Sequence, residues 1–409
     1  LEFSGQGVKT VRYWFPEKIR TDRRLTYDRM KADLGLLLAD AAAIRCDKRF
    51  HAGAHVSSGI DSGYIAAMVR RQYADQAVFY GFSWSPDGFV PARAENDERE
   101  IVRSFCSKTG ISPVFSDMGR DDFSRIIDSY FINHAWFSED RVIAQAAARG
   151  TNLLFSGWGG DEFISTGDRG IELDLLRELR LGLFFRRSRI SQPKKFIRDQ
   201  FFYVINPALG ILGRSISKSF RDDARYIKRK YSQSDRGALR NFYFHTSRRQ
   251  LHLRLLDFYH LQERCEIWYL MGYRKGVEYR FPLLDRRIIE YMLKVPTAPL
   301  CRTGHFRPLL RDLGGDLVPE EVRWNLSKND PVYWEWMDGL FREAATGYMS
   351  ESDSWKQNPD LFFVNFNLLK EDIQRHFAGT GTSDRRVLYR ALVYIKAIHE
   401  YTKWYNGNR

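Results

Sequence analysis

Ser57-Ser58-Gly59-Ile60-Asp61-Ser62 is a hydroxyl-rich hexapeptide that follows an apolar run at residues 51–56 and begins a segment with helical spacing. Helix starts attract anions, because their first N–H groups have no partner within the helix and the peptide dipoles sum to a partial positive charge. A compact turn here would direct N–H groups and hydroxyls at a polyphosphate, with Asp61 holding its divalent cation. The same residues also suit an ordinary serine-rich N-cap. The hexapeptide alone leaves both interpretations open.

The composition is that of a folded, basic protein. Of the 409 residues, 44% are hydrophobic and 15% are aromatic, which excludes a disordered chain. The net charge of +13 suits a polyanionic partner, although an ordinary basic protein has it too. The four cysteines form no CxxC pair, which argues against a zinc ribbon and favours a reducing, cytoplasmic location. No apolar stretch reaches the roughly 18–20 residues that a membrane span needs.

Apolar runs alternate with helical spacing over the first 165 residues. The runs lie at 51–56, 77–84, 112–116 and 152–156, and the helical patterns lie at 26–45, from 61 onward, at 101–110, at 121–131 and at 139–148. This alternation predicts an α/β fold with a parallel sheet flanked by helices, followed after about residue 170 by a mostly helical region. A final helix is expected at 384–405, with Ser383 as its N-cap.

A second turn follows the run at 152–156 and reads Ser156-Gly157-Trp158-Gly159-Gly160-Asp161-Glu162. Its three glycines permit a close approach between backbone and ligand. Both turns fall at carboxyl ends of predicted strands, where such sheets bind ligands. Asp61 and Asp161 are therefore expected to bind magnesium over a triphosphate, since Mg²⁺ is usually held by one or two carboxylates and phosphate oxygens.

These two turns resemble the PP-loop and the second nucleotide loop of the ATP-dependent domain of the asparagine synthetase family. The segment from Gly276 to Asp285 is similar to the family's E-x-R-x-P-[FL]-L-D segment, and residues 307–328 resemble its closing basic segment. The matches keep the family's order over residues 13–330. The resemblance implies a five-stranded parallel PP-loop sheet, like that of the adenine nucleotide alpha hydrolases, with ATP and Mg²⁺ as cofactors.

The resemblance also implies roles for individual residues. Ser57, Ser58, Gly59 and Ser62 would cradle the pyrophosphate, while Asp61 and Asp161 bind Mg²⁺. The adenosine pocket would be lined by Val56, Ser156 and Gly157. Lys328 would neutralise charge on the phosphates, unless it is a solvated loop lysine. Glu278 and Arg280 either take a direct part in catalysis or form a structural ion pair with each other.

The implied reaction is the ATP-dependent formation of an amide bond. A substrate carboxylate attacks the α-phosphate of ATP, which gives an acyl-adenylate and releases pyrophosphate, and ammonia or an amine then attacks the activated carbonyl. The carboxylate belongs to a small molecule or a peptide. Positioning, metal and cationic groups lower the barrier in such reactions.

The sequence departs from the family at two positions. Ser58 replaces the first glycine of the loop's usual pair, which is tolerable where the backbone does not need a positive φ. Trp158 stands where asparagine synthetases carry a glutamate and β-lactam synthetase a tyrosine, at the catalytic position that faces the adenylate. An indole is no general base. The required carboxylate is therefore absent or supplied by Glu162 or Glu278, and a product other than asparagine is favoured.

The pattern along the chain predicts four parts. They are a linker at 1–25, a PP-loop core at 26–165, a basic helical insertion at 166–265 and a helical remainder at 266–409. The chain begins at Leu1 without a nucleophilic cysteine, so we expect a glutaminase domain to be missing or to lie on another chain. The basic residues at 186–230 form either a solvated insertion or a peripheral membrane contact.

Other functions stay open at this stage. A tailoring cyclase that forms a lactam or a peptide amide is one alternative within the family. A tRNA-modifying PP-loop enzyme is less favoured, because no stacking platform for nucleic acid stands out. A pseudoenzyme that only binds a partner is opposed by the retained Asp61, Asp161 and Lys328. A homo-oligomer is compatible with the sequence.

Overall fold

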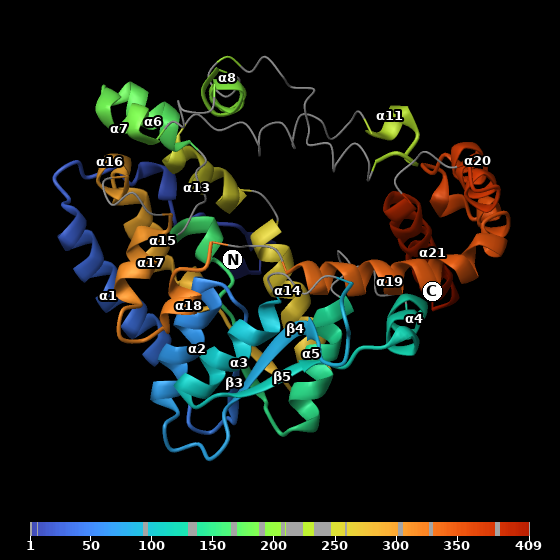
Figure 1. Ribbon diagram of the computed structural model, residues 1–409, viewed down its shortest axis with the longest axis horizontal. Coiled ribbons are helices and arrows are strands. Elements are labelled where there is room, and N and C mark those ends of the chain that lie inside the picture. Colours follow the sequence, from blue (N-terminus) through green and yellow to red (C-terminus); the bar gives the residue numbers. More distant parts are fainter. Residues whose placement is uncertain are drawn as a thin grey trace.

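The computed structural model describes most of the chain: residues 2–5, 7–92, 97–129, 137–164, 170–187, 193–205, 209, 224–232, 247–257, 260–301, 306–326, 330–380 and 385–408. Its centre is a five-stranded sheet whose paired strands all run parallel (Figure 1). The order is β5-β4-β3-β6-β7, from β5 (Ser112–Ser116), β4 (Tyr80–Pro86), β3 (Ala52–His55), β6 (Leu153–Phe155) and β7 (Glu278–Arg280). The predicted α/β fold with a five-stranded parallel sheet is confirmed.

The fifth strand comes from a part of the chain that the sequence pattern describes as helical. β7 pairs with β6 in the register Leu153↔Glu278 to Phe155↔Arg280. It has only three residues, two of them charged, so it shows neither an apolar run nor alternation. The region after about residue 170 is mostly helical as predicted, and the pattern within it does not show this one strand.

Helices cover both faces of the sheet, as expected for buried parallel strands. On one face, Leu153 and Phe155 pack into a core with α1 (Tyr27–Ala43), α2 (Ile60–Gln72) and α3 (Glu98–Thr109). On the other face, Leu154 packs with Val142 and Trp268 of α5 (Phe137–Ala148) and α14 (His260–Tyr273). Neighbouring residues of β6 thus point to opposite cores.

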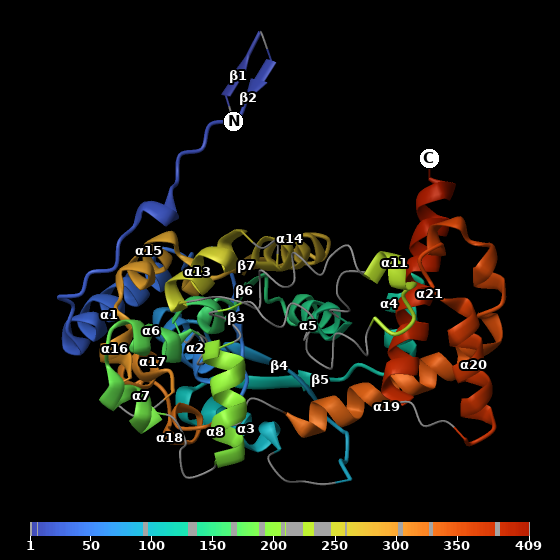
Figure 2. The same ribbon diagram turned by 90° about the horizontal axis from the view of Figure 1, so that it is seen from above.

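A second group of helices lies to one side of the sheet, at the right of Figures 1 and 2. It comprises α4 (Arg120–Asp128), α19 (Pro331–Tyr348), α20 (Phe366–Phe377) and α21 (Arg385–Gly407). These helices have their own core, built around Phe123, Leu340, Trp355 and Leu392. α21 confirms the predicted final helix, while its expected cap Ser383 lies outside the described residues.

The remaining helices connect these parts. They are α6 (Ile171–Arg177), α7 (Leu181–Arg187), α8 (Pro193–Gln200), α11 (Arg229–Ser232), α13 (Arg248–Asp257), α15 (Arg286–Lys294), α16 (Thr297–Leu300), α17 (Pro308–Leu313) and α18 (Glu320–Arg323). The basic stretch at 186–230 is described only in part. None of the helices in the described parts is long and apolar enough to cross a membrane.

The first residues form an arm with a small hairpin at its end. β1 (Glu2–Ser4) and β2 (Gly7–Lys9) pair in antiparallel fashion, and Figure 2 shows the hairpin standing apart from the helices and the sheet. The arm is fixed farther along, where the indole N–H of Trp14 donates to Glu290 Oε1 at 2.8 Å. Residues 10–15 have no regular secondary structure.

Candidate functional site

The first turn of the site joins β3 to α2 and is organised by its own hydroxyl groups. Gly59 is the N-cap of α2, with an extended backbone, and its N–H donates to Ser57 Oγ at 3.1 Å. The Oγ atoms of Ser57 and Ser62 lie 2.6 Å apart, and Ser62 also donates to the carbonyl of Gly59 at 3.1 Å. These bonds fix a compact turn at the start of a 13-residue helix, a position that attracts anions.

The second turn follows β6 and leads into a π-helical segment, Gly160–Ile164. The N–H of Trp158 donates to Ser156 Oγ at 3.1 Å, and the N–H of Gly159 donates to Glu162 Oε2 at 3.1 Å. Gly159 has a φ of +101°, which side chains disfavour. The serine and the glutamate thus act as local caps for this tight connection.

Two glycines let the turns touch. A Cβ atom on Gly157 would lie 2.6 Å from the backbone nitrogen of Ser62, and one on Gly160 would lie 2.3 Å from Asp61 Oδ1. Contacts this short are not tolerated between real atoms. The second turn therefore has the glycines that its packing against the first turn requires.

The closest approach of the turns brings two carboxylates onto one cation. Arg307 Nη1 donates to Asp61 Oδ2 at 2.6 Å, and Arg307 Nη2 donates to Asp161 Oδ1. Within the described residues, no group of three or more His, Cys, Asp or Glu side chains is placed to hold a metal ion. A pair of convergent carboxylates fits Mg²⁺ that arrives with a polyphosphate, since phosphate oxygens then complete its coordination. Arg307 shows that this position holds positive charge.

The turns open into a cavity of about 720 Å³. Most of the residues that the sequence predicts for the site line this cavity together: Val56, Ser57, Ser58, Gly59, Asp61, Ser62, Ser156, Gly157, Trp158 and Asp161. They come from the turns that follow β3 and β6 and from the starts of the helical segments after these turns. The carboxyl edge of the sheet thus gathers them, as the strand order requires.

Trp158 lies in the cavity wall beneath an arginine. The guanidinium carbon of Arg264, on α14, lies 3.4 Å from the centre of the Trp158 ring. Burial lowers the pKa of Arg264 to about 10, while the carboxyl of Glu162 opposes this shift. The guanidinium stays charged near neutral pH, so this wall of the cavity presents a cation stacked on an aromatic ring.

Two glutamates in the cavity wall have raised pKa values. Burial raises the pKa of Glu162 to about 7, and the neighbouring Asp161 adds to the shift. Burial likewise raises the pKa of Glu98 to about 7, with Asp330 adding to it, although Glu98 accepts a hydrogen bond from Ser58 Oγ at 3.0 Å. Sequence reasoning missed Glu98, because nothing in its spacing shows that the start of α3 faces the first turn.

A buried network supports the second turn from beneath. Glu139 accepts a hydrogen bond from Trp84 Nε1 at 2.6 Å and another from the hydroxyl of Tyr279, and it lies 3.0 Å from His55 Nε2. Burial acts to raise the pKa of Glu139, but the charge of His55 and these hydrogen bonds outweigh it and hold the pKa below its ordinary value. The other ring nitrogen of His55 lies 3.3 Å from Ser156 Oγ, which caps the turn.

Of the predicted catalytic residues, Glu278 lies away from this cavity. Glu278 lies at the first position of β7, opposite Leu153 at the start of β6, and so at the amino end of parallel strands. It pairs with Arg280 at 2.5 Å, which is the structural ion pair that the sequence left open. Among the described residues that line the cavity, Glu278 does not occur. Lys328 lies outside the described residues.

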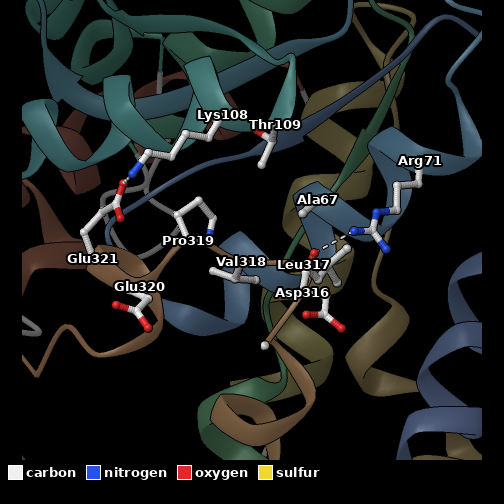
Figure 3. Close-up of a pocket in the computed structure, with 11 residues that line it drawn as sticks. Ala67, Arg71, Lys108, Thr109, Asp316, Leu317, Val318, Pro319, Glu320 and Glu321 are labelled. Atoms are coloured by element: carbon white, nitrogen blue, oxygen red, sulfur yellow. Dashed lines mark hydrogen bonds and ion pairs between the residues drawn. The ribbon is translucent and has the colours of Figure 1, made fainter.

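A second hollow of about 520 Å³ lies between the ends of α2 and α3 and the segment 315–321 (Figure 3). Arg71 reaches across it to the carbonyl of Asp316 at 2.7 Å, and Lys108 pairs with Glu321 at 2.6 Å. Its basic groups thus have protein partners. The described residues that line it include none that the sequence predicts for the site.

Comparison with protein families gives a match over most of the chain. A family described as asparagine synthase matches residues 33–400, which include both turns, Arg307 and most of the helical group around α19. No curated protein matches the chain. The family match covers nearly the whole chain, and the site lies inside it.

Proposed function

The chain belongs to the asparagine synthase family, and we propose that it is a ligase that activates a carboxylate with ATP and joins it to an amine or ammonia. Residues 33–400 form an asparagine synthase-type ATP-dependent domain. The observation that carries the proposal is the convergence of Asp61 and Asp161 on one cation at the start of α2. It supports the binding of a magnesium–polyphosphate ligand rather than of a neutral one.

The first turn is proposed to hold the phosphates. Ser57, Ser58, Gly59 and Ser62 would donate N–H and hydroxyl groups, while Val56, Ser156 and Gly157 line the adenosine side. When bound by Asp61 and Asp161, Mg²⁺ would neutralise phosphate charge. Lys328 is proposed to assist there, because Asn325 and Asp330 on either side of it both line the cavity.

The proposed reaction has two displacements. An oxygen of the substrate carboxylate bonds to the α-phosphorus as the bond from this phosphorus to the bridging oxygen breaks, and pyrophosphate leaves. The amine nitrogen then bonds to the acyl carbon, the bond from this carbon to the oxygen of AMP breaks, and the amine loses a proton. The protein contributes position and preorganised charge, which supply most of the catalysis in such transfers.

The identity of the substrate is proposed to differ from aspartate. Trp158 brings no carboxylate to the cavity, and Arg264 covers its ring at 3.4 Å. At position 158 the wall thus offers an aromatic surface beside a positive charge, and not an acid that would orient an incoming ammonium. A lactam or peptide amide, formed with an amine of the substrate itself, is the second candidate. A glutaminase partner would be needed only if ammonia is the nucleophile.

The test is pyrophosphate release from ATP with a panel of carboxylates, with and without ammonium, in wild type and Asp61→Ala. Asp75→Ala is a matched control, because Asp75 is an exposed partner of Lys48 on the surface. We expect release in wild type and in the control and its loss in Asp61→Ala. Absence of release with every carboxylate, or equal release in Asp61→Ala, would contradict the proposal.

A further inference from the structure

One arginine neutralises both carboxylates of the proposed magnesium site. The two terminal nitrogens of Arg307 reach different acids, Asp61 at 2.6 Å and Asp161. Only 10% of the Arg307 side chain is exposed, so the guanidinium lies between the turns and not on the surface. A planar guanidinium can pair with two carboxylates at once, which the single ammonium of lysine does less well.

The backbone of Arg307 is held in an unfavourable conformation. Its φ of +56° and ψ of 45° place it in the left-handed region, and within the described residues Leu179 is the other non-glycine residue with a positive φ. Side-chain sterics disfavour this region, so such a conformation persists only where its surroundings fix it. An outlier of this kind at a ligand site points to a function for the side chain that it directs.

Neighbouring contacts fix this conformation and tie it to the first turn. Arg311, one turn later, donates to the carbonyl of Phe306 at 2.7 Å and to that of Asn325 at 2.9 Å. The amide of Asn325 in turn donates to the carbonyl of Ser58 at 3.2 Å. The backbone at Arg307 is therefore linked through Arg311 and Asn325 to the first turn, which holds the guanidinium beside Asp61.

We propose that Arg307 is an exchangeable counter-ion, which keeps free magnesium from Asp61 and Asp161 without nucleotide and pairs with the phosphates when nucleotide brings its metal. The glycines of the second turn bring this turn against Asp61, and both acids contact Arg307, so their like charges repel each other less when a cation lies between them. Arg307 supplies this charge from within the chain. With nucleotide and its metal bound, Arg307 would pair with phosphate oxygens as its new anionic partner in the cavity. The inference rests on the proposed function only for the identity of the nucleotide.

The experiment is a titration with Mn²⁺, without nucleotide, that follows the free ion by electron paramagnetic resonance. Arg307→Gln is expected to bind Mn²⁺ at least about tenfold more tightly than wild type, because the competing charge is gone. In a second titration with ATP, the same variant is expected to bind the nucleotide more weakly. An arginine with only a structural role would not shift the two affinities in opposite directions.

Three further variants complete the test. Arg71→Gln is the matched control and is expected to bind Mn²⁺ as wild type does, because Arg71 contacts the carbonyl of Asp316 outside the site. The double variant Asp61→Asn with Arg307→Gln is expected to lose the increase in Mn²⁺ affinity that Arg307→Gln shows alone. If Arg307→Gln fails to fold, Arg307→Lys replaces it in the titration. Because lysine keeps the positive charge, this variant is expected to show a smaller increase in Mn²⁺ affinity.

Equal Mn²⁺ affinities in wild type and in the folded Arg307 variant would overturn the proposal, as would a gain that survives Asp61→Asn. The titration without nucleotide uses neither ATP nor a carboxylate. Failure of the proposed ligase reaction would therefore leave its result intact, and the two failures are distinguishable.

Discussion

The α-carbon of Gly160 lies against the side chain of Asp61, so closely that a Cβ atom on residue 160 would come within 2.3 Å of Asp61 Oδ1. Asp61 cannot move aside freely, because its other oxygen is held by Arg307 at 2.6 Å. The second turn therefore determines where the first carboxylate points. The geometry of the cation site therefore depends on residue 160 being a glycine, which has no Cβ atom.

Gly160→Ala is the first prediction. The added methyl group must displace the Asp61 carboxylate, and a misplacement of about 1 Å at a reacting site can cost about 100-fold in rate. We expect a loss of this order in the kcat/KM for pyrophosphate release, together with about 1–3 kcal/mol of unfolding free energy from overpacking. Kinetics and urea unfolding measure the two effects.

Gly339→Ala is the control for this change. Gly339 lies within α19, and a Cβ atom there would meet nothing within 4 Å. Alanine in a helix interior is expected to add about 0.5–1 kcal/mol of stability without an effect on turnover. Wild-type kinetics in Gly160→Ala would show that Asp61 has room that the packing does not indicate.

The fold could be predicted from the sequence wherever burial leaves a periodic trace. The apolar runs at 51–56, 77–84, 112–116 and 152–156 became β3 to β6, because strands buried on both faces need apolar residues at nearly every position. β7 lacked such a trace, since Glu278 and Arg280 are charged and half-exposed. Its place in the sheet depends on pairing with β6, which is a tertiary contact.

The site was predictable where one short segment contains both the turn and the residues that would contact a ligand. The hexapeptide at 57–62 and Gly157 of the second turn are of this kind, and the structure places both at the cavity. Arg307, just before α17, and Arg264, in α14, are far from the turns in sequence, so no local spacing shows which of many basic residues reaches the turns. The sequence therefore identifies the two loops, whereas the residues that contact them depend on tertiary packing.

The stack of Arg264 on Trp158 gives the second prediction. Removing a cation–π contact in a half-buried position costs about 1 kcal/mol. In a double-mutant cycle with Arg264→Met and Trp158→Leu, we expect a coupling energy of about this size in urea unfolding, because neither single variant leaves the contact in place. If the changes in unfolding free energy of the two single variants add up to that of the double variant within about 0.3 kcal/mol, the two side chains are close but do not stabilise each other.

Glu98 gives the third prediction, on pH. Its pKa of about 7 in the folded protein exceeds the ordinary value of 4.5, so the folded state keeps a proton that the unfolded state releases. The stability from this group is complete below about pH 4.5 and is lost as the pH rises through about 7. Because Glu98→Gln stays neutral, its melting temperature is expected to rise relative to wild type between pH 5 and about pH 8.

The control for this pH dependence is Glu100→Gln, two residues farther along α3. Glu100 is exposed and pairs with Arg103 at 2.7 Å. Its melting temperature relative to wild type is expected to be flat over the same range. A flat difference for Glu98→Gln as well would show that the Glu98 carboxyl titrates as an ordinary exposed glutamate.

Glu139 gives the fourth prediction, and Asp140→Asn beside it is the control. Glu139→Ala is expected to cost about 3–5 kcal/mol of unfolding free energy, because it leaves His55 and the donors of Trp84 and Tyr279 without their buried acceptor. Asp140 pairs with Lys275 near the surface, so Asp140→Asn is expected to cost at most about 1 kcal/mol.

The pH dependence of the Glu139 effect tests its cause. The pKa of Glu139 is held below its ordinary value of 4.5, so its contribution is present above that pH and is lost as the pH falls below it. The difference in unfolding free energy between wild type and Glu139→Ala should therefore shrink in acid. A difference that stays constant would assign the effect to lost packing alone. His55 also contacts Ser156, which caps the second turn. If Glu139→Ala destabilises the protein by removing the charge beside His55, nucleotide binding should weaken as well. If the variant only removes packing away from the turn, nucleotide binding should not change.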